Sequence, residues 1–378
     1  QFTKHYEKGD HPLEYISTRQ WFVKVLDYKK ELIEQGRKVK WHPESMFKRY
    51  EQWVEGLNQD WCISRQRFFG VAFPVWYPLD ENSRPDYENP IYASQDQLPV
   101  DPLSEVPKGY TEEQRGKPNG FMGDPDVMDT WATSSLTPQI SSHWGTDDKR
   151  HKSLFPADLR PQAHEIIRTW AFYTITKAWM HDTEIPWKNI AISGWVVDPH
   201  KKKMSKSKGN VVTPESLIDQ YSSDALRYWA AKAKLGSDTI YDENVFKIGQ
   251  RLATKMFNAS KFVFLQIEDV EDKWLGPENI TEAVDRVWIE KLNKVIEDST
   301  KFFEDYNYSG VLSQVESAFW EFCDIYLELV KTRAYKLKDS AAGRSALASL
   351  SYTWKSFIKL FAPFLPYICE EVWSWNFA

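Results

Sequence analysis

The scarcity of helix-breaking residues in the last third of the chain limits its fold more than any other feature. Between residue 250 and Pro363 the sequence holds only three glycines and one proline. Apolar residues recur there at spacings of three and four: Ile248, Leu252, Met256 and Ala259; then Val287, Leu292, Val295 and Ile296; then Val315, Phe319, Phe322, Ile325 and Leu329. Such spacing is typical of helices with one buried face. The sequence therefore predicts an all-α antiparallel helix bundle over 244–378.

Residues 61–243 have a different texture, with short apolar runs separated by proline and glycine. The runs 71–77 and 189–197 are rich in Val, Ile and aromatic residues, which predicts strands. The run 163–181 is apolar nearly all round, which predicts a buried helix. Residues 78–126 carry many Pro, Asp, Glu and Gly residues and predict a surface excursion. Alternating strands and helices indicate an α/β domain.

Length and composition bound the class of protein. A chain of 378 residues predicts two or three domains. No apolar run is long enough to cross a bilayer, and Cys62, Cys323 and Cys369 lie too far apart in sequence to form a disulfide framework or a Cys-x-x-Cys zinc site. We therefore expect a reducing, cytoplasmic location. The net charge of -6 argues against a uniformly basic surface but leaves room for a local basic groove that binds RNA.

The stretch KKKMSKSKGN, residues 201–210, places five lysines and two serines in ten positions. It follows a predicted strand and precedes Thr213 and Pro214, a typical start of a helix. Lysine ammonium groups and serine hydroxyls suit phosphate oxygens, and Gly209 allows a close approach of the backbone. An ordinary solvated loop explains the same residues, so this stretch alone leaves both interpretations open.

Other motifs, in order along the chain, resemble those of class I aminoacyl-tRNA synthetases, most closely the valine-specific branch. Lys203–Ser207 reads KMSKS, the second signature of that family. The other motifs are WCISRQRFFG (61–70), MDTWATSSLTP (128–138), HEIIRTW (164–170), ISGWVVD (192–198), YSSDALRYW (221–229), RLATKMFNASKF (251–262) and PFLPYICEEVW (363–373). The resemblance covers essentially the whole chain.

The resemblance implies an organisation in three parts. Residues 1–60 are the segment returning from the editing insertion. Within them the apolar residues of the stretch 21–36 recur at helical spacing, which predicts a helix that ends near Gly36. Residues 61–243 are the C-terminal half of a Rossmann-like catalytic domain, with the KMSKS loop and the stem-contact region. Residues 244–378 are the helical anticodon-binding domain, incomplete at its C-terminus. The family's first signature, His-x-Gly-His, does not occur in the sequence. We therefore expect a missing N-terminal half of the same protein, and a chain that is inactive alone.

The resemblance also implies roles for single residues. The substrates would be valine, ATP with Mg2+ and tRNA(Val), with no structural zinc. Lys203 and Lys206 would be catalytic. The ATP-binding residues would be Gly194, Lys203, Met204, Ser205, Lys206 and Ser207. Trp131 and Ile166 would wall the pocket for the amino-acid side chain, and Glu165 would face the α-ammonium group. The tRNA-binding residues would be Arg251, Lys255 and Lys261.

Each role has an alternative that the sequence leaves open. Trp131 and Ile166 suit core packing, and Arg168 could satisfy Glu165 in place of a ligand. Arg65 and Arg67 could simply pin a junction between domains, and the three bundle cations could form a solvated helix face. Two rival functions also stay open: an isoleucine- or leucine-specific member of the family, and a non-catalytic tRNA-binding module derived from one.

Overall fold

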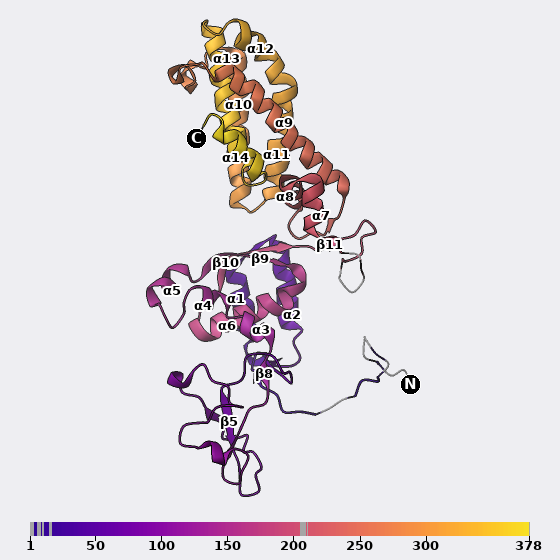
Figure 1. The fold of residues 1–378 in the computed structure, drawn as a ribbon, viewed down its shortest axis with the longest axis vertical. Helices are drawn as coiled ribbons and strands as arrows, with labels where there is room; N and C mark the ends of the chain where they lie inside the picture. Colours follow the sequence, from indigo (N-terminus) through magenta and orange to yellow (C-terminus); the bar gives the residue numbers. More distant parts are fainter. Residues whose placement is uncertain are drawn as a thin grey trace. The chain divides into compact units, whose positions relative to one another are not determined.

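The computed structural model describes residues 4–5, 9, 11–14, 17–204, 209 and 211–377. The chain divides into two compact units (Figure 1). Unit 1 consists of residues 1–40, 47–160 and 165–190, and unit 2 consists of residues 41–46, 161–164 and 191–378. The catalytic site residues implied by the resemblance are therefore divided between the units, and each unit is described by itself.

Short helices and small antiparallel sheets make up most of unit 1. Its helices are α1 (Lys29–Lys38), α2 (Phe47–Glu55), α3 (Thr130–Ser134), α4 (Thr137–Ser141), α5 (Asp148–Leu154) and α6 (Phe172–Asp182). Helices α1 and α2 pack very closely at Gly36, where an added Cβ would lie 2.2 Å from Cε1 of Tyr50. The Tyr50 hydroxyl donates a hydrogen bond to the carbonyl oxygen of Leu32 at 2.9 Å. This glycine is therefore required by packing.

Three of the small sheets of unit 1 are antiparallel. Strand β5 (Val75–Pro78) lies between β6 (Ile91–Tyr92) and β7 (Phe121–Gly123), β1 (Phe22–Val23) pairs with β3 (Trp61–Cys62), and β4 (Ser64–Arg65) pairs with β8 (Val127–Met128). The predicted surface excursion contains β6 and β7. It has a buried centre of its own, since Trp76 and Phe121 are fully buried.

Strands β9 (Ala157–Ala163) and β10 (Trp187–Ser193) are neighbours in a sheet of order β2-β10-β9, where β2 is Lys40–His42. Near their starts, Ala157 N donates to the carbonyl oxygen of Pro186, and near their ends Ser193 Oγ donates to that of Gln162. The two strands therefore run in the same direction, joined by α6. Parallel strands joined by a helix are the repeating unit of Rossmann-like folds, which confirms the predicted α/β class.

Unit 2 contains a parallel pair of strands and the predicted helix bundle. Strand β11 (Val196–Val197) pairs with β12 (Thr239–Ile240) and is separated from it by α7 (Pro214–Tyr221) and α8 (Ser223–Lys232). The bundle consists of α9 (Glu243–Ile267), α10 (Ala283–Glu304), α11 (Tyr308–Glu321), α12 (Leu327–Lys336), α13 (Ala341–Phe361) and α14 (Pro366–Ser374), drawn in orange to yellow in Figure 1. A π-helical turn, Phe322–Tyr326, joins α11 to α12. Buried aromatic rings, among them Phe319, Phe322, Trp354 and Phe357, fill its centre. The predicted all-α bundle is confirmed.

Four predicted elements have different bounds in the structure. The strand expected over 71–77 begins only at residue 75, as β5. Residues 22–23 form β1 rather than the start of a helix, because they pair with 61–62. The helix expected from residue 163 begins with a 3-10 turn over 164–166 and a π-helical turn over 167–171. The strand expected over 189–197 is interrupted at Gly194 and Trp195. In each case a tertiary contact or a local turn overrides the apolar pattern.

Two of the motifs that carry the family resemblance meet inside unit 2. The Asp224 carboxylate, on α8, accepts hydrogen bonds from the amides of Tyr367 (3.2 Å) and Ile368 (2.8 Å) in the first turn of α14. Arg227 donates to the carbonyl oxygens of Pro363 (2.7 Å) and Phe364 (3.1 Å). A residue of α8 therefore caps α14, and the motifs YSSDALRYW and PFLPYICEEVW are joined by hydrogen bonds. Burial raises the pKa of Asp224 above its ordinary value.

A buried ion pair connects helices α10 and α12 of the bundle. Asp285, on α10, is 0% exposed. Both of its oxygens accept hydrogen bonds from Arg333 of α12, at 2.7 Å each. Tyr326 and Ser345 also donate to this carboxylate, at 2.7 and 2.6 Å.

None of the helices in the described residues combines the length and apolar character that a membrane crossing requires.

Candidate nucleotide and aminoacyl site

The carboxyl ends of β9 and β10 give the candidate site its position. In open α/β sheets, ligands bind beyond the carboxyl ends of the strands. His164 directly follows β9, and Gly194 directly follows β10. An added Cβ at Gly194 would lie 2.2 Å from the carbonyl oxygen of Ser237. Internal packing alone therefore requires this glycine, and its predicted contact with adenosine stays a prediction.

Trp195 is the centre of a polar and aromatic cluster after β10. Its backbone N–H donates to Oδ1 of Asp238 at 2.8 Å, and Nε2 of His164 lies 3.5 Å from the same oxygen. The rings of His164 and Trp195 are 4.7 Å apart. The ammonium group of Lys203 lies 4.7 Å from the centre of the Trp195 indole. The cluster therefore holds the first lysine of the KMSKS motif against an aromatic ring.

A tight turn delivers Lys203 to this position. Oδ1 of Asp198 accepts hydrogen bonds from the amides of His200 (2.9 Å) and Lys202 (2.8 Å). The amide of Asp198 in turn donates to the carbonyl oxygen of Lys202 at 2.8 Å, and Lys203 forms a β-bridge with Val197. Met204 is half-buried, while Ser205, Lys206 and Ser207 lie outside the described residues. The described part of the loop is therefore a hydrogen-bonded hairpin rather than a free lysine-rich strand.

The predicted amino-acid pocket residues lie in unit 1, on elements that are fastened together. Trp131 is on α3, and Glu165 and Ile166 are in the 3-10 turn after β9; all three are half-buried. The indole N–H of Trp170 donates to the carbonyl oxygen of Ser134 at 3.3 Å, which ties α3 to the segment that follows Ile166. Half-burial is compatible with walls of an open pocket, and the three roles stay predictions.

The WCISRQRFFG block braces the start of α3. Nη1 of Arg65 donates to the carbonyl oxygens of Cys62 (3.2 Å) and Ser64 (2.7 Å), and Nη2 lies 3.3 Å from Oδ2 of Asp129, which precedes α3. Trp61 stacks on Tyr173 with 3.8 Å between the ring centres. Burial, and then the charge of Asp129, raises the pKa of Tyr173. Arg65 therefore braces elements within unit 1, and these contacts do not test the role at a junction between domains that the sequence left open.

The three predicted tRNA-binding cations lie on α9 and differ in their surroundings. Arg251 and Lys261 are exposed. Nζ of Lys255 lies 3.8 Å from a carboxylate oxygen of Asp324. At 3.6 residues per turn, Lys261 is rotated by about 80° from Arg251, so the three cations do not form one narrow stripe. The ammonium group of Lys261 lies 4.3 Å from the centre of the Phe257 ring, and the tRNA-binding roles of all three cations stay predictions.

One polar group at the strand ends was missed by sequence reasoning. Gln162, near the end of β9, is buried, and its Oε1 accepts no hydrogen bond from the described residues. Its Nε2 reaches only the carbonyl oxygen of Ala163, at 3.5 Å. A buried amide oxygen without a partner calls for an explanation, such as an ordered water or a bound ligand. No sequence pattern marks such a residue.

Elsewhere, the described residues offer no group of three His, Cys, Asp or Glu side chains that could hold a metal ion.

Comparison with known proteins agrees with this geometry. Valine--tRNA ligase of Thermobifida fusca is 54% identical over 98% of this chain and 42% of its own length. Valine--tRNA ligase of Bifidobacterium longum is 49% identical over 100% of this chain and 44% of its own length. The chain therefore spans less than half the length of these relatives.

Solved structures share the fold. A Mycobacterium tuberculosis methionyl-tRNA synthetase in complex with methionyl-adenylate aligns with a TM-score of 0.68 and 18% identity, covering 97% of this chain and 64% of that one. An Agrobacterium radiobacter LeuRS in a ternary complex aligns with a TM-score of 0.63 and 21% identity, covering 85% of this chain and 42% of that one. At such identities the likeness concerns the fold alone.

Family models match both parts of the chain. Residues 285–377 match the anticodon-binding domain of tRNA ligases. Residues 5–242 match the class I tRNA synthetases for isoleucine, leucine, methionine and valine. The resemblance drawn from the motifs is therefore confirmed, and the chain belongs to the class I tRNA synthetase family.

Proposed function

We propose that the chain is part of a valine–tRNA ligase, which activates valine with Mg-ATP and transfers it to tRNA(Val) in the cytoplasm. The observation that carries the proposal is identity of about one half to valine--tRNA ligases along the entire chain. The identity covers the catalytic-type segment and the helical segment alike, whereas the structural neighbours named for leucine and methionine are 21% and 18% identical.

In the proposed reaction, a carboxylate oxygen of valine attacks the α-phosphorus of ATP and pyrophosphate leaves. The chain's residues act by positioning and by charge, because no protein nucleophile is needed. Lys203 and Lys206 neutralise the negative charge that builds on the departing pyrophosphate. Ser205 and Ser207 donate hydrogen bonds to phosphate oxygens, and the backbone at Gly194 and Met204 lies against the nucleotide.

Recognition of valine falls to unit 1. Trp131 and Ile166 supply apolar surface for the branched side chain, and Glu165 accepts hydrogen bonds from the α-ammonium group. Such a pocket excludes larger side chains by volume. Its polar contact is strong only while the ammonium group is charged, because a charge-assisted hydrogen bond needs both ionised partners.

The bundle of unit 2 would bind tRNA. Arg251 and Lys261 are exposed and available to phosphates, while Lys255 must first give up part of its interaction with Asp324. We expect Arg251→Ala to weaken tRNA binding more than Lys255→Ala does, because the latter also frees Asp324 to repel the backbone.

Titration of ATP against this chain tests the nucleotide site. Lys203→Ala and Lys206→Ala should each weaken ATP binding by about tenfold, the loss of one charge-assisted contact. Lys201→Ala is the matched control, because Lys201 lies in the turn rather than at the bridge with Val197. Unchanged ATP binding in both variants, together with retained tRNA binding, would instead support a non-catalytic tRNA-binding module.

Amino-acid specificity needs the longer protein that carries this chain. ATP–pyrophosphate exchange with valine, isoleucine and leucine should favour valine, and the isolated chain should show negligible exchange. Preference for isoleucine or leucine would overturn the valine assignment. Robust exchange by the isolated chain would show that the expected dependence on a missing half is wrong.

A further inference from the structure

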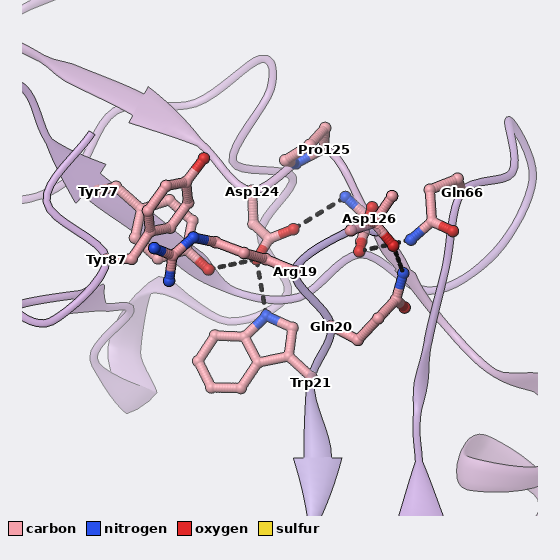
Figure 2. A pocket seen from close by; sticks show the side chains of 10 residues that line it. Arg19, Gln20, Trp21, Gln66, Tyr77, Tyr87, Asp124, Pro125 and Asp126 are labelled. Carbon is pink, nitrogen blue, oxygen red and sulfur yellow. Dashed lines mark hydrogen bonds between the residues drawn. The ribbon is translucent and has the colours of Figure 1, made fainter. Parts of the chain in front are cut away.

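Unit 1 contains a cavity of about 610 Å³ whose lining residues have no role in the reaction proposed above. It is lined by residues 18–21 and 124–126 and by Gln66, Tyr77 and Tyr87 (Figure 2). The volume lies within the range of small-molecule sites, about 300–1,000 Å³. The lining joins aromatic rings, a cation and two carboxylates in one cavity.

Asp124 holds several of the lining residues of this cavity in place. Only 4% of Asp124 is exposed, and its Oδ2 accepts hydrogen bonds from the Trp21 indole at 2.7 Å and the Tyr77 hydroxyl at 2.6 Å. Its Oδ1 accepts from the amide of Asp126 at 2.8 Å. The carboxylate thus fixes two aromatic rings and the backbone that presents Asp126. Figure 2 shows these three bonds converging on Asp124.

Arg19 lies across the cavity's aromatic surface. Its guanidinium carbon is 4.4 Å from the centre of the Tyr87 ring, and Tyr87 packs edge-on against Tyr77 at 4.8 Å. Within the described part of the chain, the structure gives Arg19 this aromatic partner and no carboxylate. Tyr87 is 38% exposed, so the pair is accessible from solvent. A guanidinium held on a ring and free of a carboxylate is well placed to bind a phosphate.

Asp126 supplies a hydrogen-bond acceptor to the same cavity. Nε2 of Gln66 donates to its Oδ2 at 2.9 Å, and the residue is half-buried. Burial, with a further contribution from the charge of Asp124, raises the pKa of Asp126. A carboxylate in such surroundings gains from an N–H donor that binds beside it.

We propose that this cavity binds a nucleotide whose base carries an exocyclic amine, with cytosine the best match. Arg19, held on the Tyr87 ring, binds the phosphate, the Trp21 ring packs against the base, and Asp126 accepts a hydrogen bond from the cytosine N4 amine. Aromatic stacking tolerates every base, whereas a carboxylate selects cytosine through its N4 donors. Uracil has a carbonyl oxygen at that position, which a carboxylate repels.

Two sources share this chemistry: a free nucleotide, and an unpaired nucleotide of an RNA such as the 3′ end of tRNA. Only the RNA source rests on the proposed function, since the cavity's chemistry is independent of the reaction at the KMSKS loop.

The test is calorimetric titration of the chain with cytidine and uridine 5′-monophosphates, and with the trinucleotides CpCpA and UpUpU. Cytidine monophosphate should bind about tenfold more tightly than uridine monophosphate, the discrimination expected of one good base contact. Asp126→Asn should remove that preference, because the asparagine amide can pair with either base. Arg19→Ala should weaken both mononucleotides equally. Tighter binding of CpCpA than of cytidine monophosphate identifies RNA as the source, and equal binding identifies the free nucleotide.

Arg84→Ala is the matched control for Arg19→Ala, since Arg84 is another exposed arginine of unit 1, outside the cavity. Circular dichroism and thermal unfolding establish that each variant is folded. Equal binding of cytidine and uridine nucleotides by the unaltered chain would overturn the proposal, as would unaltered affinity in Arg19→Ala. Lys203→Ala should leave these titrations unchanged, so failure at this cavity and failure of the proposed ATP site are read separately.

Discussion

Two buried carboxylates, one in each unit, are held in opposite ways. Asp285 of unit 2 lies against Arg333, and two hydroxyl groups complete its contacts. Among the described residues, Asp124 of unit 1 accepts its hydrogen bonds from neutral groups, an indole, a phenol and an amide. The first carboxylate is paired with a cation inside a helix bundle, whereas the second is held by dipoles and borders a cavity.

The difference separates a structural charge from one that acts on its surroundings. In a buried ion pair whose carboxylate oxygens already accept hydrogen bonds from the protein, no oxygen is available to a ligand. A carboxylate stabilised by dipoles alone still attracts cations and N–H donors nearby. The helix bundle therefore uses its carboxylate to fix three helices, and unit 1 uses its carboxylate to shape a binding cavity.

Breaking the ion pair of unit 2 should give the largest effect. Arg333→Ala leaves Asp285 buried without its cation, and the loss should be about 3–5 kcal/mol in the free energy of unfolding. Urea denaturation followed by circular dichroism measures it. The double variant Asp285→Asn/Arg333→Met should recover much of the loss. Equal losses in the single and double variants would show that the charge itself matters little.

Removing the carboxylate of unit 1 should cost less. Asp124→Ala deprives the Tyr77 hydroxyl and the Trp21 indole of their acceptor, and we expect a loss of about 2 kcal/mol, because unsatisfied buried donors are costly but the indole can reach water. The same denaturation measurement checks it, with Asp126→Asn as the control that should change stability little. A loss as large as that of Arg333→Ala would erase the distinction between the two carboxylates.

Asp224 offers an intermediate case, a buried carboxylate on a helix N-terminus. Asp224→Ala should destabilise the chain by about 1 kcal/mol, the usual cost of a lost cap, while Asp224→Asn should cost less at neutral pH. Because burial raises the pKa of Asp224, its carboxylate disfavours the folded state as pH rises through the acid range. The unaltered chain should therefore lose stability over that range relative to Asp224→Asn, in unfolding experiments at several pH values. An identical pH dependence in both proteins would contradict this.

An exposed carboxylate gives the smallest effect. Hydrogen bonds from Lys108, and then from Ser94, lower the pKa of Asp96 to about 2. Lys108→Ala should raise that pKa toward its ordinary value with no measurable change in the unfolding midpoint, because the pair is solvated. A pH titration followed by NMR reads the Asp96 carboxyl directly. A pKa that stays near 2 would mean that Ser94 and the backbone suffice.

Sequence reasoning predicted the parts of the fold that repeat a simple period. The bundle followed from apolar spacing such as that of Leu252 and Met256, because a helix with one buried face leaves that spacing in any sequence. The 3-10 turn over 164–166 and the π-helical turn over 167–171 have no such periodic pattern in the sequence. Nor does the pairing of residues 22–23 with 61–62, since it depends on a partner strand about forty residues away.

The site was predictable to the extent that it consists of motifs. Lys203 and Gly194 were found because they stand in recognisable strings, although the structure shows that packing against Ser237 alone already demands the glycine. Gln162, Arg19 and Asp126 were missed. The unpartnered buried oxygen of Gln162, and the cavity that Arg19 and Asp126 line, exist only in the folded chain. No local spacing encodes them.

The turn at Asp198 limits how many residues can lie between Asp198 and Lys203. Between Asp198 and the β-bridge at Lys203 lie only four residues, and the Asp198 side chain holds two of their amides. Lys201 itself has a left-handed backbone conformation, with φ of 61°, and one added or deleted residue in the turn changes the register. A strand's side chains alternate between its two faces, so such a shift would turn Met204 or Lys202 toward Trp195 in place of Lys203. The number of residues in this turn therefore decides which side chain faces Trp195.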